Sequence, residues 1–217
     1  TVLDSLSVGA TLKRPERRDI LEPLVTALHE GQAQGAFRAE HLLHLRCEVS
    51  DPATMALADA TVGHPLTRLV SIMDHTPGDR QSPDVERWFA HMIHEMEVDE
   101  ATGREMMDDL FERSRARGAE VRAHVVATAR AAGVPMMSHD DRTEAHVDQA
   151  VAEGIRVAEF PTTLAAARRA RLAGMQIVAG APNYLRGGSQ SGNVAVADLL
   201  GQGLVTELAS DYVPPSP

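Results

Sequence analysis

Residue types suited to metal binding and acid–base chemistry recur along the sequence, each time just after a short aliphatic run. Carboxylates and imidazoles are common ligands of divalent metal ions, and a nearby carboxylate can accept a proton from bound water. If they gathered in one place, these residues would make a hydrolytic metal site. In chain order the segments are Arg46-Cys47-Glu48, Asp74-His75-Thr76-Pro77-Gly78, Ser138-His139-Asp140-Asp141, Glu159-Phe160-Pro161-Thr162-Thr163, Gly180-Ala181-Pro182-Asn183 and Ser210-Asp211-Tyr212.

Helix capping is a second explanation for some of these polar residues. Asp140, Asp141 and Thr162 each precede a stretch with helical spacing, and short polar side chains are preferred at helix N-termini. For any one of these residues taken alone, helix capping is as good an explanation as a functional site. Because polar residues recur after six successive aliphatic runs, however, the whole pattern favours a site.

A glycine-rich segment over residues 185–193, Leu-Arg-Gly-Gly-Ser-Gln-Ser-Gly-Asn, has the composition of an anion-binding loop. An arginine can form paired bonds to phosphate, while glycines let backbone amides approach an anion closely. The segment matches neither the Walker loop nor the dinucleotide-binding spacing, and a bland flexible loop is the alternative. The candidate substrate-binding residues are Arg186, Gly187, Gly188, Ser189, Ser191 and Asn193.

The intervening pattern of strand, loop and helix predicts how these residues are positioned. Near-continuous aliphatic runs predict strands over residues 1–6, 42–49, 68–74, 134–138, 155–160, 175–179 and 204–209. Helices are expected over 15–34, interrupted or kinked at Pro23, from about 52, over 84–132 with a break near 98–103, and from about 143, 162 and 193. Seven such units suggest a (β/α)8 barrel that lacks one strand, with a doubly wound sheet as the alternative. In such a barrel the polar segments would meet at the carboxyl ends of the strands.

Composition excludes several classes of protein. The chain has 217 residues, 43% hydrophobic and 24% charged, which excludes a disordered segment. Its net charge of -10 argues against nucleic-acid partners and against binding to an anionic membrane. Cys47 is alone, so no internal disulfide forms, and we expect a buried core thiol. No apolar run approaches the roughly 20 residues of a membrane span, and we expect a cytoplasmic protein.

Taken together and in order, the motifs resemble the PhnM family, amidohydrolase-superfamily proteins of phosphonate (carbon–phosphorus lyase) metabolism. The resemblance covers essentially the whole chain and implies metal-dependent hydrolysis of α-D-ribose 1-methylphosphonate 5-triphosphate to the 5-phosphate and pyrophosphate. It rests on the segments His44-Leu45-Arg46-Cys47-Glu48, Met73-Asp74-His75-Thr76-Pro77-Gly78, Ser138-His139-Asp140-Asp141, Glu159-Phe160-Pro161-Thr162-Thr163, Gly180-Ala181-Pro182-Asn183, Arg186-Gly187-Gly188-Ser189 and Ser210-Asp211-Tyr212-Val213-Pro214.

The same resemblance implies an amidohydrolase (β/α)8 barrel domain over residues 1–217, truncated at both ends so that the first strand and a C-terminal part are missing. It implies a divalent metal, with zinc expected. Glu48 would be the bridging carboxylate, His139 and His75 imidazole ligands, and Asp211 the last ligand and the general base. The implied partner is a small-molecule ribose triphosphate, with no nucleic acid and no membrane, and assembly of identical copies is left open. Gln190 and Asp79 depart from the family pattern, which usually has His and Gln there.

Two other functions stay open at this point. A different amidohydrolase reaction, such as deamination or amide hydrolysis, could use the same scaffold, because fold alone does not select a reaction. A non-catalytic subunit of a phosphonate-processing assembly is the third hypothesis, and it would not need to bind metal at the strand ends.

Overall fold

The structure, a computed structural model, describes residues 1–12, 14–189 and 192–210. The chain divides into two compact units, each described below by itself. Unit 1 comprises Thr1–Thr76 and Asp84–Met136, and unit 2 comprises Pro77–Pro83 and Met137–Pro217.

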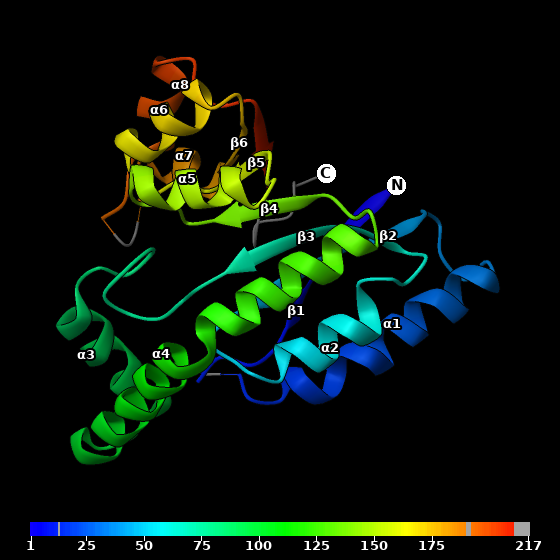
Figure 1. The fold of residues 1–217 in the computed structure, drawn as a ribbon, viewed down its shortest axis with the longest axis horizontal. Helices are drawn as coiled ribbons and strands as arrows, with labels where there is room; N and C mark the ends of the chain where they lie inside the picture. The colour runs from blue at the N-terminus through cyan, green and yellow to red at the C-terminus, as the bar shows by residue number, and fades with distance from the viewer. Residues whose placement is uncertain (13, 190–191, 211–217) are drawn as a thin grey trace. The chain divides into compact units, whose positions relative to one another are not determined.

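Unit 1 is built on three parallel strands, β1 (Val2–Val8), β2 (His41–Glu48) and β3 (Thr67–Met73). Successive side chains of β2 point to opposite faces of the strand. Leu43, Leu45 and Cys47 are fully buried on one face, and Glu48 is the last residue on the other. The helices α1 (Arg17–Ala33) and α2 (Thr54–Thr61) connect these strands and pack against them and each other (Figure 1). The parallel strands are thus covered by helices, as aliphatic strands require.

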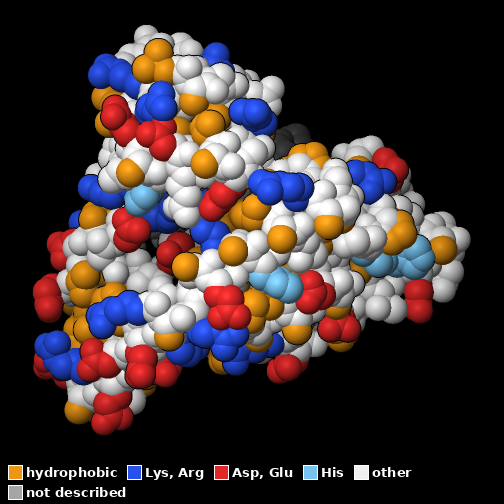
Figure 2. All heavy atoms as spheres, viewed as in Figure 1, with side chains coloured by type: hydrophobic (Ala, Val, Ile, Leu, Met, Phe, Trp, Pro, Cys, Tyr) orange, Lys and Arg blue, Asp and Glu red, His pale blue; other side chains and the backbone are white. Residues whose placement is uncertain are grey.

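A helical hairpin follows β3 in unit 1. It consists of α3 (Val85–Met96) and the long α4 (Glu100–Ala131). Asp84 and Asp99 cap the two helices with their side chains, which accept bonds from backbone amides three residues on. A small core of Phe89, Met92 and Met107 holds the hairpin together. Over these helices acidic and basic side chains are interspersed at the surface (Figure 2).

Unit 2 repeats the strand–helix alternation with shorter elements. Its strands pair in parallel and in chain order, and α5 packs against α6 (Figure 1). Thr143 and Thr163 cap α5 and α6, so the capping explanation for Asp140, Asp141 and Thr162 is wrong. The elements are β4 (Met136–His139), α5 (Glu144–Ala152), β5 (Val157–Glu159), α6 (Leu164–Leu172), β6 (Gln176–Gly180), α7 (Ala181–Arg186), α8 (Val196–Gly201) and β7 (Glu207–Ala209).

All seven predicted strands are present among the described residues, and the chain is an α/β protein with parallel strands. Helix α1 continues through Pro23, so the interruption expected there was wrong, while the alternative of a kink stays a prediction. The loop expected after β6 was also wrong, because α7 forms there and Arg186 ends it. Closure into a barrel, and one domain over the whole chain, stay predictions.

Within the described part of the chain, no helix combines the length and the apolar character needed to cross a membrane.

Candidate functional site

In unit 1, two of the predicted metal ligands lie together at the ends of neighbouring strands. Glu48 ends β2 and is almost completely buried, and His75 follows β3 by two residues. The His75 Nδ1 atom lies 2.6 Å from Glu48 Oε2, and the Ser50 hydroxyl donates to Glu48 Oε1 at 2.8 Å. Burial alone would raise the pKa of Glu48, but His75 and Ser50 together lower it. Glu48 is therefore held as a carboxylate.

In unit 2, His139 lies between two acidic side chains at the ends of β4 and β5. Its Nδ1 atom is 2.7 Å from Glu159 Oε2, and its Nε2 atom is 3.2 Å from Asp140 Oδ2. All three residues are buried. Burial lowers the pKa of His139, but the Asp140 and Glu159 carboxylates outweigh it and raise the pKa to about 10. In the absence of a metal, this imidazole therefore carries a proton at neutral pH.

The backbone turns sharply directly after β4 and β5, and this places the side chains around His139. Asp140 and Phe160 both have positive φ, 53° and 57°. This conformation is uncommon for residues other than glycine and costs free energy. The backbone amides of both residues still continue the sheet, donating to Glu159 O and Val178 O at 2.9 Å. The Phe160 ring then meets the His139 ring edge-on, with centroids 5.6 Å apart.

The chemistry of these donor atoms fits a divalent metal. Each unit offers an imidazole beside a buried carboxylate, and such nitrogen and oxygen atoms suit zinc and similar ions. In unit 2, Glu159 on Nδ1 would orient the ring, as a carboxylate behind a metal-bound histidine does. A metal at His139 would have to displace the proton that the two carboxylates favour. Asp211, the predicted last ligand and base, lies outside the described residues.

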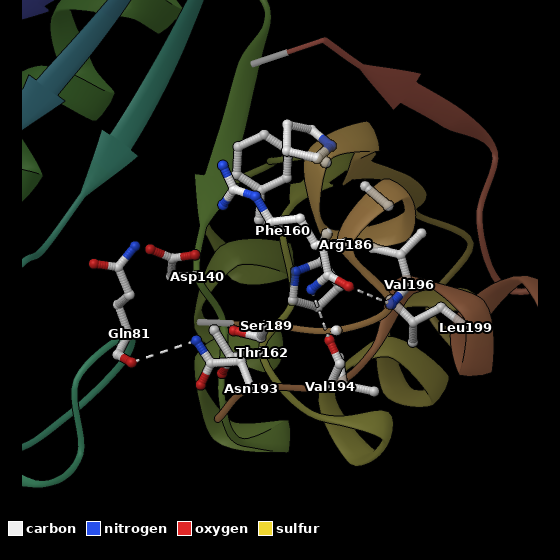
Figure 3. Close-up of a pocket in the computed structure, with 16 residues that line it drawn as sticks. Gln81, Asp140, Phe160, Thr162, Arg186, Ser189, Asn193, Val194, Val196 and Leu199 are labelled. Carbon is white, nitrogen blue, oxygen red and sulfur yellow. Dashed lines mark hydrogen bonds between the residues drawn. The ribbon is translucent and has the colours of Figure 1, made fainter. Parts of the chain in front are cut away.

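A pocket of about 240 Å³ in unit 2 brings together much of the predicted substrate-binding segment. Figure 3 shows Gln81, Asp140 and Asn193 on one side of it and the apolar Val196 and Leu199 on the other. Of the predicted residues, Arg186, Gly188, Ser189 and Asn193 line the pocket, Gly187 does not, and Ser191 lies outside the described residues. The remaining lining residues are Phe160, Pro161, Thr162, Ala179, Gly180, Pro182, Asn183 and Val194.

Side-chain amides hold the walls of this pocket. Asn183 on α7 donates to Val194 O at 3.1 Å and accepts from the Val196 amide at 2.9 Å (Figure 3). Asn193 donates to Gln81 O at 3.4 Å. Sequence reasoning placed Asn183 at a strand end without assigning it this role, and it missed Gln81 altogether. No local signal marks Gln81, because its place depends on how the segment 77–83 docks.

Arg80 docks that segment. The Arg80 Nη1 atom donates to Asp141 Oδ1 at 2.6 Å and to the His139 carbonyl at 3.3 Å. Both side chains of the ion pair are buried, and Ser138 donates to the second carboxylate oxygen of Asp141. Asp141 therefore has a structural role, two residues after the candidate metal ligand His139. Arg80 is the basic residue in the segment Pro77–Pro83, and sequence reasoning did not consider that it could pair with a carboxylate elsewhere in the chain.

Comparison with known proteins identifies one informative relative. No family model matches the chain. The chain is 38% identical over 216 residues, essentially all of its length, to the α-D-ribose 1-methylphosphonate 5-triphosphate diphosphatase of Escherichia coli (strain K12), and it spans 57% of that protein's length. The resemblance that the motifs predicted is therefore confirmed, and the chain is a homologue of that diphosphatase.

Proposed function

We propose that this chain carries metal ligands and substrate contacts of an enzyme that hydrolyses a phosphoanhydride bond. The proposed substrate is α-D-ribose 1-methylphosphonate 5-triphosphate, the compound named for its relative. The observation that carries the proposal is the buried imidazole of His139 between Glu159 and Asp140, because two buried carboxylates around one imidazole leave an excess of negative charge that a bound metal cation would offset. The proposed architecture is an amidohydrolase (β/α)8 barrel.

The proposed metal ligands are Glu48, His75, His139 and Asp211. A bound divalent ion, for which zinc is expected, would lower the pKa of a water molecule towards about 7 and neutralise phosphate charge. Glu159 would keep the His139 ring oriented, and Asp211 would accept the proton of the attacking water. The water oxygen forms a bond to the α-phosphorus while the bond to the bridging oxygen breaks. Pyrophosphate leaves, and the 5-phosphate stays on the ribose.

The pocket in unit 2 would hold an anionic group of this substrate. Arg186 supplies a guanidinium, and Ser189 and Asn193 line the same pocket with hydrogen-bonding groups. The amides of Gly187 and Gly188, together with Ser191, are proposed to complete the contacts. This polar side faces an apolar wall, and a pocket of that kind fixes the orientation of a small molecule.

The test is release of pyrophosphate from α-D-ribose 1-methylphosphonate 5-triphosphate by the intact enzyme, with metal content measured on the same sample. We expect His139→Gln to lose both bound metal and turnover. His124→Gln is the matched control, because His124 is a partly exposed residue of α4 that pairs with Asp59. Asp211→Asn should reduce turnover at least about 100-fold, in the range of general-base contributions.

Two outcomes would contradict the proposal. Full turnover in His139→Gln would remove the metal centre from the mechanism. Hydrolysis of an amide or deamination of a base, with no pyrophosphate released from the triphosphate, would favour another amidohydrolase reaction. A protein that binds no metal and catalyses neither reaction would fit a non-catalytic subunit.

A further inference from the structure

The segment that follows β1 is strongly basic in an otherwise acidic chain. Residues 10–18 contain Lys13, Arg14, Arg17 and Arg18 with only one carboxylate, Glu16, while the net charge of the whole chain is -10. Local concentrations of guanidinium groups are typical of sites that bind phosphate. The segment therefore needs a physical explanation beyond a solvated surface.

The fold holds this segment close to the end of β2. The Asp51 carboxylate accepts from the Ala10 amide at 2.6 Å and from Arg18 Nε and Nη2 at 2.8 Å each. Gly9 has φ 89°, and a Cβ there would lie 2.1 Å from Thr54 Oγ1, so only glycine lets the chain pass so closely. The segment is thus anchored three residues beyond Glu48, the buried carboxylate proposed as a metal ligand.

More than one guanidinium lies near Glu48. Arg46 precedes it by two residues on β2 and therefore lies on the same face of the strand. Arg17 begins α1. Burial and the neighbouring charges of Arg14 and Arg46 lower the pKa of Arg17, and Glu16 and Glu48 do not compensate for them. A bound polyanion would relieve this repulsion.

A cavity of about 160 Å³ within unit 1 is lined in part by this basic segment, through Pro15 and Arg18, which are the sequence neighbours of Arg14 and Arg17. Its polar lining includes Thr11, Arg18, Ser50 and Arg113. The Ser50 hydroxyl also donates to Glu48, so this wall adjoins the candidate metal ligand. This volume lies below the roughly 300–1,000 Å³ of pockets that enclose a whole small-molecule ligand, so it suits a diphosphate group better than a whole sugar triphosphate.

We propose that this cavity, together with Arg14, Arg17 and Arg46, forms a polyphosphate subsite that holds the terminal diphosphate of the substrate. The assignment rests on the proposed function for the identity of the substrate. Charge develops on the departing pyrophosphate as its bond to the α-phosphorus breaks. Guanidinium groups at that position would stabilise the charge where it appears. The proposed subsite is built from residues of unit 1 alone, and none of them lines the pocket around Arg186.

The experiment measures binding of pyrophosphate and of inorganic phosphate to the intact enzyme by calorimetry, which needs no turnover. The variants are Arg17→Gln and Arg14→Gln, and Arg117→Gln is the control, since Arg117 is an exposed residue of α4 paired with Glu120. Loss of a charge-assisted bond predicts about tenfold or more weaker pyrophosphate binding for Arg17→Gln. The effect on phosphate should be smaller, because it carries fewer charges. The control should change neither constant more than about twofold.

The side chain of Arg14 is 63% exposed, so Arg14→Gln is expected to fold and keeps the test decisive if Arg17→Gln is unstable. Unchanged pyrophosphate binding in Arg14→Gln and in any folded Arg17→Gln would overturn the subsite. Equal weakening of phosphate and pyrophosphate binding would also overturn it, because the arginines would then not distinguish pyrophosphate from the shorter anion. If pyrophosphate binding depends on these arginines while the ribose triphosphate is not hydrolysed, the subsite stands and the proposed function fails.

Discussion

Replacing Arg80 by methionine should destabilise the protein by about 3 kcal/mol. Methionine keeps much of the apolar stem but leaves the buried Asp141 carboxylate without its cation. Removing one partner of a buried ion pair costs about 3–5 kcal/mol. The Arg80 Nε atom is already buried without a hydrogen-bond partner among the described residues, which costs about 1–3 kcal/mol in the native protein. Because the variant removes that burden as well, we expect the lower end of the range.

The assay is urea unfolding of the intact protein in a double-mutant cycle with Asp141→Leu. Each single variant leaves one charge buried, whereas the double variant leaves none. We therefore expect the double variant to be more stable than the sum of the single effects by at least about 2 kcal/mol. Arg104→Met is the matched control: its pair with Glu100 on α4 is exposed, so its loss should cost at most about 1 kcal/mol.

Two results would refute this reasoning. A cost below about 1 kcal/mol for Arg80→Met would mean that Asp141 finds water or another donor once the arginine is gone. Single effects that add within about 0.5 kcal/mol would mean that the two side chains act independently. Either result would also remove the argument that Arg80 docks the segment that brings Gln81 to the pocket.

Four further predictions follow from single contacts. Glu159→Gln should weaken metal binding about 10–100-fold, measured by competition with a chelator, because it alters the acceptor that orients the imidazole, and unchanged affinity would count against that role. Gly9→Ala should lower the free energy of unfolding by about 2–4 kcal/mol, since it adds strain at positive φ and a clash with Thr54; a loss under about 1 kcal/mol would contradict this. Arg186→Ala should lower kcat/KM more than Arg186→Lys, because lysine keeps the positive charge but cannot form paired bonds to a phosphate; equal losses in the two variants, or no loss in either, would show that Arg186 does not bind an anionic group of the substrate in this way. Cys47 should resist thiol reagents at pH 8 until the protein is unfolded, because burial and then the Glu48 charge raise its pKa to about 12, and rapid labelling of the native protein would refute this.

The sequence by itself determined the elements and the order of the polar segments. Aliphatic runs bounded by glycine are local signals, so the strands that end at Glu48 and His139 lie where they were predicted. Helix α7 escaped prediction because six residues are too few to show a helical period. Pro23 does not interrupt α1, because tertiary packing of the buried Leu21 and Val25 holds the helix together on both sides of it.

Only the tertiary structure decided which side chains meet. Arg80 and Asp141 are 61 residues apart and Gln81 and Asn193 are 112 apart, and neither residue of a pair carries a local mark of its partner. The same holds for Glu159 behind His139, where two strand ends had to be brought into register before the carboxylate could reach the ring. Residue types and spacing specify what chemistry a segment can supply. The distances that make it a site depend on long-range packing, which one stretch of sequence does not encode.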